Sequence, residues 1–134
     1  MRKWRIEYRP EYQSTPVSFW VHRHLDGDAW VWSKTFDPPL PAAIPCKGFP
    51  YLVVDALGTE LEFASIEEAE HFLDVISQKN MPTTEQLSRK RSDAKGPNSH
   101  WLSRLPAGLK PWNKRQKIIP IMEAGIRALK DVYR

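Results

Sequence analysis

The sequence predicts one α+β domain over residues 1–134. Its expected core is an antiparallel sheet of four or five strands, arranged as a meander with one clear hairpin and packed by one helix. A long basic loop, residues 82–110, and a C-terminal helix follow. Three observations predict this order. Short apolar and alternating segments fill the first half of the chain, apolar residues at helical spacing follow them, and residues 82–110 show no sustained periodicity. With 134 residues and 41% apolar side chains, the chain is long enough for one packed core.

The first expected strand is "KWRIEYR", in which apolar and charged residues alternate. Trp4, Ile6 and Tyr8 fall on one face, and the charged residues fall on the other. Pro10 ends this strand, because proline has no backbone N–H to donate.

The clear hairpin is expected in "VSFWVHRHLDGDAWVWSKTF". Asp26-Gly27 lies between two apolar-rich runs, a pattern typical of a two-residue turn. In that register Leu25 pairs with Asp28, and one face carries the rings of Trp30 and Trp32. Those rings either pack in the core beneath the first helix or form a stacking platform next to Arg23.

Residues 37–50 contain five prolines, which predicts an extended connector. Two further strands are expected in "YLVVDALG" and "TELEF", with a turn near Gly58. Ser65 and Glu68 have the spacing of a helical capping box, and the helix they open is expected to end near Lys79. Pro111 starts the last helical pattern, and Pro120 is expected to kink that helix or split it in two.

The charge is distributed unevenly along the chain. Residues 1–78 contain 7 Lys and Arg against 12 Asp and Glu, whereas residues 79–117 contain 10 against 2. The formal net charge of the whole chain is only +4. This asymmetry indicates either an anionic partner for residues 79–117 or mutual attraction between the two halves.

The cations of the basic segment, with two tryptophans among them, form the candidate binding site. Lysine and arginine neutralise phosphates, and aromatic rings stack on unpaired bases. The function expected is therefore non-catalytic binding of nucleic acid, with single-stranded DNA or RNA preferred to duplex. The candidate residues are Arg89, Lys90, Arg91, Lys95, Trp101, Arg104, Lys110, Trp112, Lys114, Arg115 and Lys117.

An alternative is a protein-interaction module that forms a homodimer. In it the acidic first half of one copy meets the basic segment of another, and nucleic acid has no role. The composition of residues 82–110 also suits a flexible segment within the domain that becomes ordered on contact.

The remaining patterns argue against other classes. No phosphate loop or nucleophile motif is present, the acidic residues give no sign of a buried catalytic pair, and Cys46 is the only cysteine, so no enzyme is expected. No metal or cofactor is expected either: His22 and His24 share a strand face, but no cysteine pair or HExxH motif accompanies them. The sequence shows neither a signal peptide nor a membrane span, which favours a cytoplasmic protein without a membrane partner.

Overall fold

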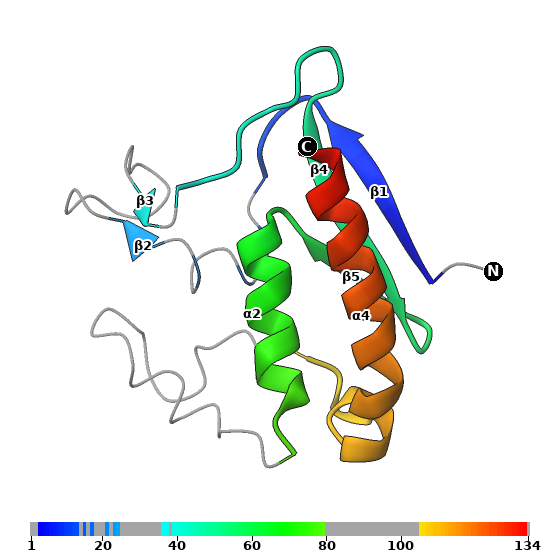
Figure 1. The fold of residues 1–134 in the computed structure, drawn as a ribbon. Coiled ribbons are helices and arrows are strands. Elements are labelled where there is room, and N and C mark those ends of the chain that lie inside the picture. Colours follow the sequence, from blue (N-terminus) through cyan, green and yellow to red (C-terminus); the bar gives the residue numbers. More distant parts are fainter. Residues whose placement is uncertain are drawn as a thin grey trace.

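The structure is a computed structural model, and it describes residues 3–13, 15, 17, 21, 23–24, 36–37, 39–79 and 105–133. Its elements are β1 (Trp4–Arg9), β2 (Arg23–His24), β3 (Phe36–Asp37), β4 (Phe49–Ala56), β5 (Thr59–Phe63), α2 (Ile66–Ser77), the short 3-10 helix η3 (Ala107–Leu109) and α4 (Trp112–Val132). Figure 1 shows α2 and α4 side by side against one face of the main sheet. The expected α+β class is confirmed.

The expected sheet of four or five strands is wrong. The main sheet of the described residues has three strands in the order β1-β4-β5, and β2 pairs only with β3. Two helices, rather than one, pack on this sheet. Alternation along a segment indicates that it suits a strand, but it does not say which sheet the strand joins, because pairing depends on residues far away in sequence.

The predicted register of the hairpin is also wrong. A two-residue loop at Asp26-Gly27 pairs residue 24 with residue 29, whereas the structure pairs His24 with Phe36 and Arg23 with Asp37. Val21, expected in the strand, has a helical backbone and is half-buried. The hairpin tryptophans lie outside the described residues.

β4 is the centre of the fold. β1 and β5 both pair with it antiparallel, and Leu52 and Val54 are fully buried beneath the helices. Phe72 of α2 and Met122 of α4 belong to the same core cluster. Gly125 brings α4 close to this strand, because a Cβ there would lie 2.8 Å from Cδ1 of Leu52.

The turn expected near Gly58 is confirmed, and it joins β4 to β5. Leu57 and Gly58 have φ angles of +53° and +94°, which are the left-handed values of a type I′ hairpin turn. The carboxylate of Asp55 accepts a hydrogen bond of 2.9 Å from the backbone N–H of Gly58. Leucine is strained at such an angle, and the side chain of Leu57 is also exposed.

Ser65 caps α2 as predicted, but the carboxylate of Glu68 reaches one residue further back than in a capping box. The hydroxyl of Ser65 accepts a hydrogen bond of 3.1 Å from the backbone N–H of Glu68, and the carboxylate of Glu68 accepts one from the backbone N–H of Ala64. The helix ends at Ser77, slightly before the predicted Lys79. The cap therefore fixes where α2 begins on the edge of the sheet.

α4 begins directly after Pro111, as predicted, and it continues through Pro120 as one helix. The expectation that proline splits the helix in two is wrong. Pro120 lies on the exposed side of α4, while Ile118 and Met122 on either side of it are buried, so the turns before and after the proline are both anchored in the core. Within the described part of the chain, neither α2 nor α4 combines the length and apolar composition that a membrane-spanning helix needs.

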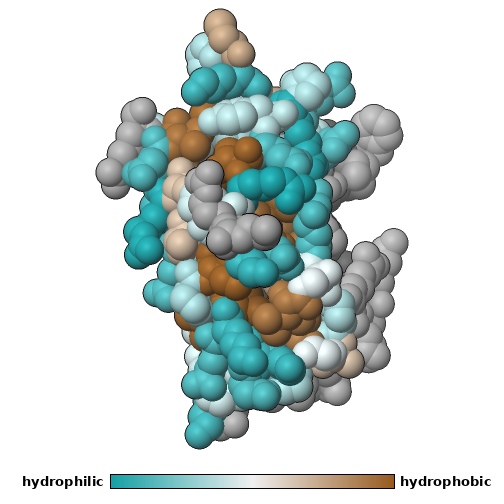
Figure 2. Space-filling view, turned by 90° about the vertical axis from the view of Figure 1, so that its right-hand side faces the viewer, coloured by the Kyte–Doolittle hydropathy of each residue, from teal (hydrophilic) through white to brown (hydrophobic). Residues whose placement is uncertain are grey.

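Figure 2 shows the side of the molecule that β1 and α4 form. Apolar atoms gather there in several patches that hydrophilic atoms separate. This agrees with the partial burial of Trp4, Ile6 and Ile121, which pack against the edge of the core.

Candidate functional site

Five of the predicted site residues are described, and they lie together at the start of α4. They are Lys110, Trp112, Lys114, Arg115 and Lys117. The other predicted residues, namely Arg89, Lys90, Arg91, Lys95, Trp101 and Arg104, lie outside the described residues. The described chain stops at Lys79, just after α2, and resumes at Leu105, just before η3. Figure 1 shows the end of α2 and the start of α4 at the same end of the helix pair. We call this end the basic end.

The start of α4 carries positive charge that is not balanced locally. Pro111 is the N-cap and provides no capping side chain, and the first turn contains no acidic residue. No Asp or Glu occurs between Leu105 and Met122. The backbone N–H groups of a helix start are themselves a partial positive charge, so the lysines add to a field of the same sign.

Ion pairing distinguishes the described cations. Lys3, Arg5, Arg9 and Lys130 all pair with carboxylates on the sheet or on α2. The four lysines of the basic end have no ion pair with any residue that the structure describes; they are Lys79, Lys110, Lys114 and Lys117. Lys79 and Lys117 are exposed, and the other two are half-buried. Lys47 and Arg127 also have no ion pair with a described residue, but they do not lie at the basic end. The basic end is therefore the place where positive charge is concentrated and left without a described counter-charge.

Arg115 has a different environment from these lysines. Its side chain is only 4% exposed, and it joins the start of α4 to the end of α2. The guanidinium donates to the backbone oxygens of Ile76 and Lys79 at 3.0 Å each, of Lys110 at 2.8 Å, and of Gln78. Burial lowers the pKa of this guanidinium from its ordinary value. Arg115 therefore caps the C-terminal end of α2, where carbonyl groups lack helical partners. Its N–H donors are largely occupied and its side chain is buried, so it offers little contact to an external ligand.

The buried position of Arg115 has a signal in the sequence. Arg115, Ile118, Met122 and Leu129 share one face at helical spacing, and that face is the buried one. A cation in such a stripe must satisfy its donors inside the protein. The periodicity thus indicates that Arg115 is internal, while its carbonyl partners on α2 only become visible in the fold.

Trp112 is half-buried next to this contact. The guanidinium carbon of Arg115 lies 5.0 Å from the centre of the indole ring, within the range of a cation–π interaction. Since Arg115 is itself held by backbone carbonyls, it fixes the orientation of the ring. Trp112 is thus a partly exposed aromatic ring among the lysines of the basic end.

Three acidic residues of the main sheet are paired with arginines of the same sheet. On the face opposite the helices, Arg5 bonds to Glu7 and Glu60, and Arg9 bonds to Glu7 and Glu62, with ion-pair distances from 2.8 to 3.2 Å. Hydrogen bonds from both arginines lower the pKa of Glu7 below its ordinary value. We call these five residues the charge ladder. Because its charges compensate one another, it presents a smaller negative field than its carboxylates alone would produce.

The described residues hold no cluster of three His, Cys, Asp or Glu side chains that suits a metal ion. One carboxylate is buried, contrary to expectation: Glu68 is fully inaccessible. It accepts hydrogen bonds from the hydroxyl of Thr15 at 2.5 Å and from the backbone N–H of Ala64, which fits its place in the cap of α2. Cys46 is a free, exposed cysteine in the connector.

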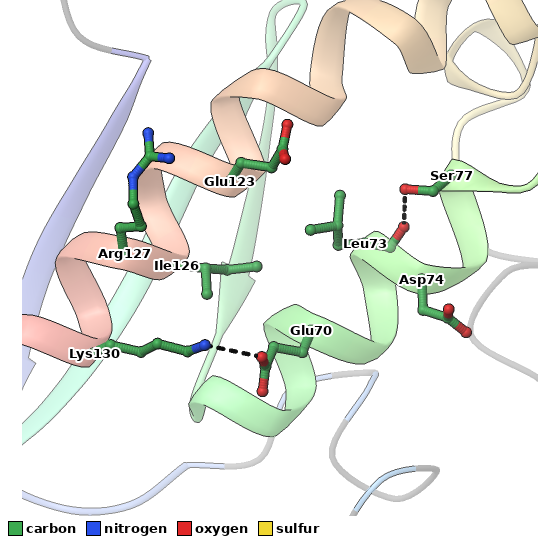
Figure 3. A pocket seen from close by; sticks show the side chains of 8 residues that line it. All are labelled: Glu70, Leu73, Asp74, Ser77, Glu123, Ile126, Arg127 and Lys130. Carbon is green, nitrogen blue, oxygen red and sulfur yellow. Dashed lines mark hydrogen bonds and ion pairs between the residues drawn. The ribbon is translucent and has the colours of Figure 1, made fainter.

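A groove lies between α2 and α4, and Figure 3 shows its lining, which includes none of the lysines of the basic end. Its volume is about 470 Å³, and its walls come only from these two helices. Because no strand contributes to it, the groove opens on the side of the helix pair that faces away from the sheet. Lys130 of α4 and Glu70 of α2 are 3.2 Å apart and bridge it at one end.

Comparisons with models of protein families, with curated proteins and with solved structures gave no match to this chain.

Proposed function

We propose that the protein binds nucleic acid without chemistry, and that the basic end is the binding surface. The observation that carries this proposal is the separation of the cations: Lys79, Lys110, Lys114 and Lys117 have no described counter-charge, whereas the ion-paired cations lie elsewhere. Unbalanced lysines attract phosphates and release counterions when they bind them. The other predicted cations lie in the sequence between Lys79 and Leu105, the two described residues on either side of that stretch.

Single-stranded nucleic acid is the preferred class of ligand. Trp112 is a partly exposed ring that Arg115 orients, and base–aromatic stacking contributes about 1–3 kcal/mol per base. Bases in a duplex are already stacked on one another, so a ring at the surface gains less from them. In this proposal the lysines hold phosphates, Trp112 stacks, and Arg115 positions both by holding the start of α4. We place the protein in the cytoplasm.

The charge ladder favours this function over electrostatic self-association. In the homodimer hypothesis, the acidic first half of one copy attracts the basic segment of another. Glu7, Glu60 and Glu62 already have arginine partners within their own sheet, which reduces what they offer to a second copy. Light scattering at low and high salt separates the two cases, because a salt-sensitive dimer without affinity for nucleic acid would support self-association instead.

Fluorescence anisotropy of a labelled single-stranded oligonucleotide, with a duplex in parallel, tests the proposal. The test variant replaces Lys110, Lys114 and Lys117 with glutamine. We expect it to bind more weakly. The negative slope of log K against log salt should become shallower by about 2, since each phosphate contact on a single strand contributes about 0.7 to its magnitude.

The matched control replaces Lys3, Lys47 and Lys130 with glutamine. It removes the same charge from other parts of the surface, so non-specific attraction falls equally in both variants. If the two triple variants bind alike, the basic end is not the binding surface. The change Trp112→Ala is expected to reduce the preference for the single strand while the salt slope stays the same.

A further inference from the structure

The groove between α2 and α4 has the features of a second binding surface, independent of the proposed nucleic-acid site. Its floor is apolar: Leu73 of α2 is half-buried and Ile126 of α4 is 5% exposed. Figure 3 shows these two side chains directed toward one another between the helices. The groove has a volume of about 470 Å³ and is wide open to solvent, so it has room for an apolar side chain from another chain.

The walls of the groove are charged, with an excess of carboxylates. Asp74 on α2 and Glu123 on α4 have no ion pair with a described residue, while Glu70 is neutralised by Lys130. Arg127 is the remaining cation of the lining. An occupant that brings positive charge to these walls therefore gains more than one that brings negative charge. The same carboxylates repel phosphates, so this groove does not extend the basic end.

The side-chain hydroxyl in the lining is already engaged. Ser77 donates to the backbone oxygen of Leu73 at 2.6 Å, which leaves shape and charge as the main means of recognition. An apolar floor between charged walls suits a peptide that inserts one apolar side chain and flanks it with charged ones. A small polar ligand would find few directed hydrogen bonds here.

We propose that this groove docks a peptide segment of a partner protein, in which an apolar anchor residue is flanked by lysine or arginine. The anchor lies between Leu73 and Ile126, and the flanking cations face Asp74 and Glu123. The bridge between Lys130 and Glu70 closes one end of the groove and sets the direction in which the peptide leaves. This proposal does not depend on the nucleic-acid function.

Selection from a displayed library of random peptides against the full chain tests the proposal. We expect the enriched peptides to share one Leu, Ile, Met or Phe with Lys or Arg close to it in sequence. Chemical shifts of the isotope-labelled protein should then change at Leu73, Asp74, Glu123 and Ile126 when an enriched peptide is added. Enrichment of acidic peptides, no enrichment, or shifts confined to other surfaces would overturn the proposal.

Charge reversal provides the matched comparison. The double variant Asp74→Lys, Glu123→Lys should bind the enriched peptide about ten-fold more weakly, because two favourable contacts become repulsive. The control Glu11→Lys, Glu67→Lys makes the same charge change at exposed positions outside the groove and should bind as the parent does. Equal binding by both variants would overturn the assignment. Shift changes at the groove on concentrating the protein alone would identify a second copy as the occupant, which also contradicts the proposal.

Discussion

Replacing Arg115 with methionine tests how the two helices are held together. Methionine keeps much of the length of the side chain and its apolar contacts, but it donates no hydrogen bonds. The change therefore removes the four bonds to the backbone oxygens of Lys110, Ile76, Gln78 and Lys79.

The size of the effect follows from the burial of these oxygens. The bond to Ile76 is buried, so its carbonyl would lose its partner without access to water, whereas the other three bonds are partly exposed and water replaces much of them. A lost bond to a charged donor costs about 1.5–3 kcal/mol when it is buried and less when water enters. We expect the free energy of unfolding to fall by about 2–4 kcal/mol in total. For a chain of 134 residues this corresponds to a decrease of roughly 10 °C in Tm.

Thermal and urea unfolding followed by circular dichroism measure this change. Lys117→Met is the control: it removes a cation from the same helix at an exposed position that has no ion pair with a described residue. The control should change stability by less than about 0.5 kcal/mol. The loss of stability for Arg115→Lys should lie between those of the two methionine variants, because an ammonium group cannot reach all the carbonyls that the planar guanidinium spans. A loss below about 0.5 kcal/mol for Arg115→Met would refute the structural role given to this residue.

Three further predictions concern the sheet and its contact with α4. Leu57→Asn should raise the free energy of unfolding by about 0.5–1 kcal/mol in urea titrations, because asparagine tolerates the left-handed φ of this turn better than leucine; a loss of stability would contradict the turn assignment. Gly125→Ala should lower stability by about 1 kcal/mol, since the clash with Leu52 exceeds the gain in helix propensity. In a Leu52→Val background the same change should become neutral or stabilising, and an unchanged penalty would rule out the clash as its cause. Lastly, Glu7 should make unfolding stability depend on pH: its lowered pKa adds stability above pH 4.5, the ordinary value, and that part is lost as pH falls through the lowered pKa. Glu7→Gln should therefore flatten the stability curve below pH 4.5, and an unchanged curve would count against the charge ladder.

The sequence predicts best the features that short-range rules determine. The alternation around Ile6, the turn at Gly58, the cap formed by Ser65 and Glu68, and the helix start after Pro111 each depend on residues a few positions apart. All four are present in the structure. The turn and the cap make their hydrogen bonds locally, whereas β1 pairs with β4, which is distant in sequence.

The features that could not be predicted depend on contacts between distant segments. The register of His24 with Phe36 and the three-stranded order of the main sheet are decided by which strands meet, and alternation alone does not specify that. The passage of α4 through Pro120 depends on buried neighbours that hold the helix. In the candidate site, the clustering of lysines was visible as charge along the chain, but the internal role of Arg115 required the carbonyls at the end of α2.

The central position of β4 has a consequence for how the protein folds. β4, β5 and α2 are consecutive in sequence, so they can associate through short loops, whereas β1 and α4 must reach the same strand from distant parts of the chain. We therefore expect a folding nucleus of a hairpin and its adjoining helix, which leaves the half of β4 that α4 covers open to solvent until the last step. During that interval Leu52 and Val54 form an exposed apolar strand surface, the kind of surface through which partly folded chains aggregate. Mutations that loosen α4 should then reduce the yield of refolding more strongly than their effect on the stability of the finished fold would suggest.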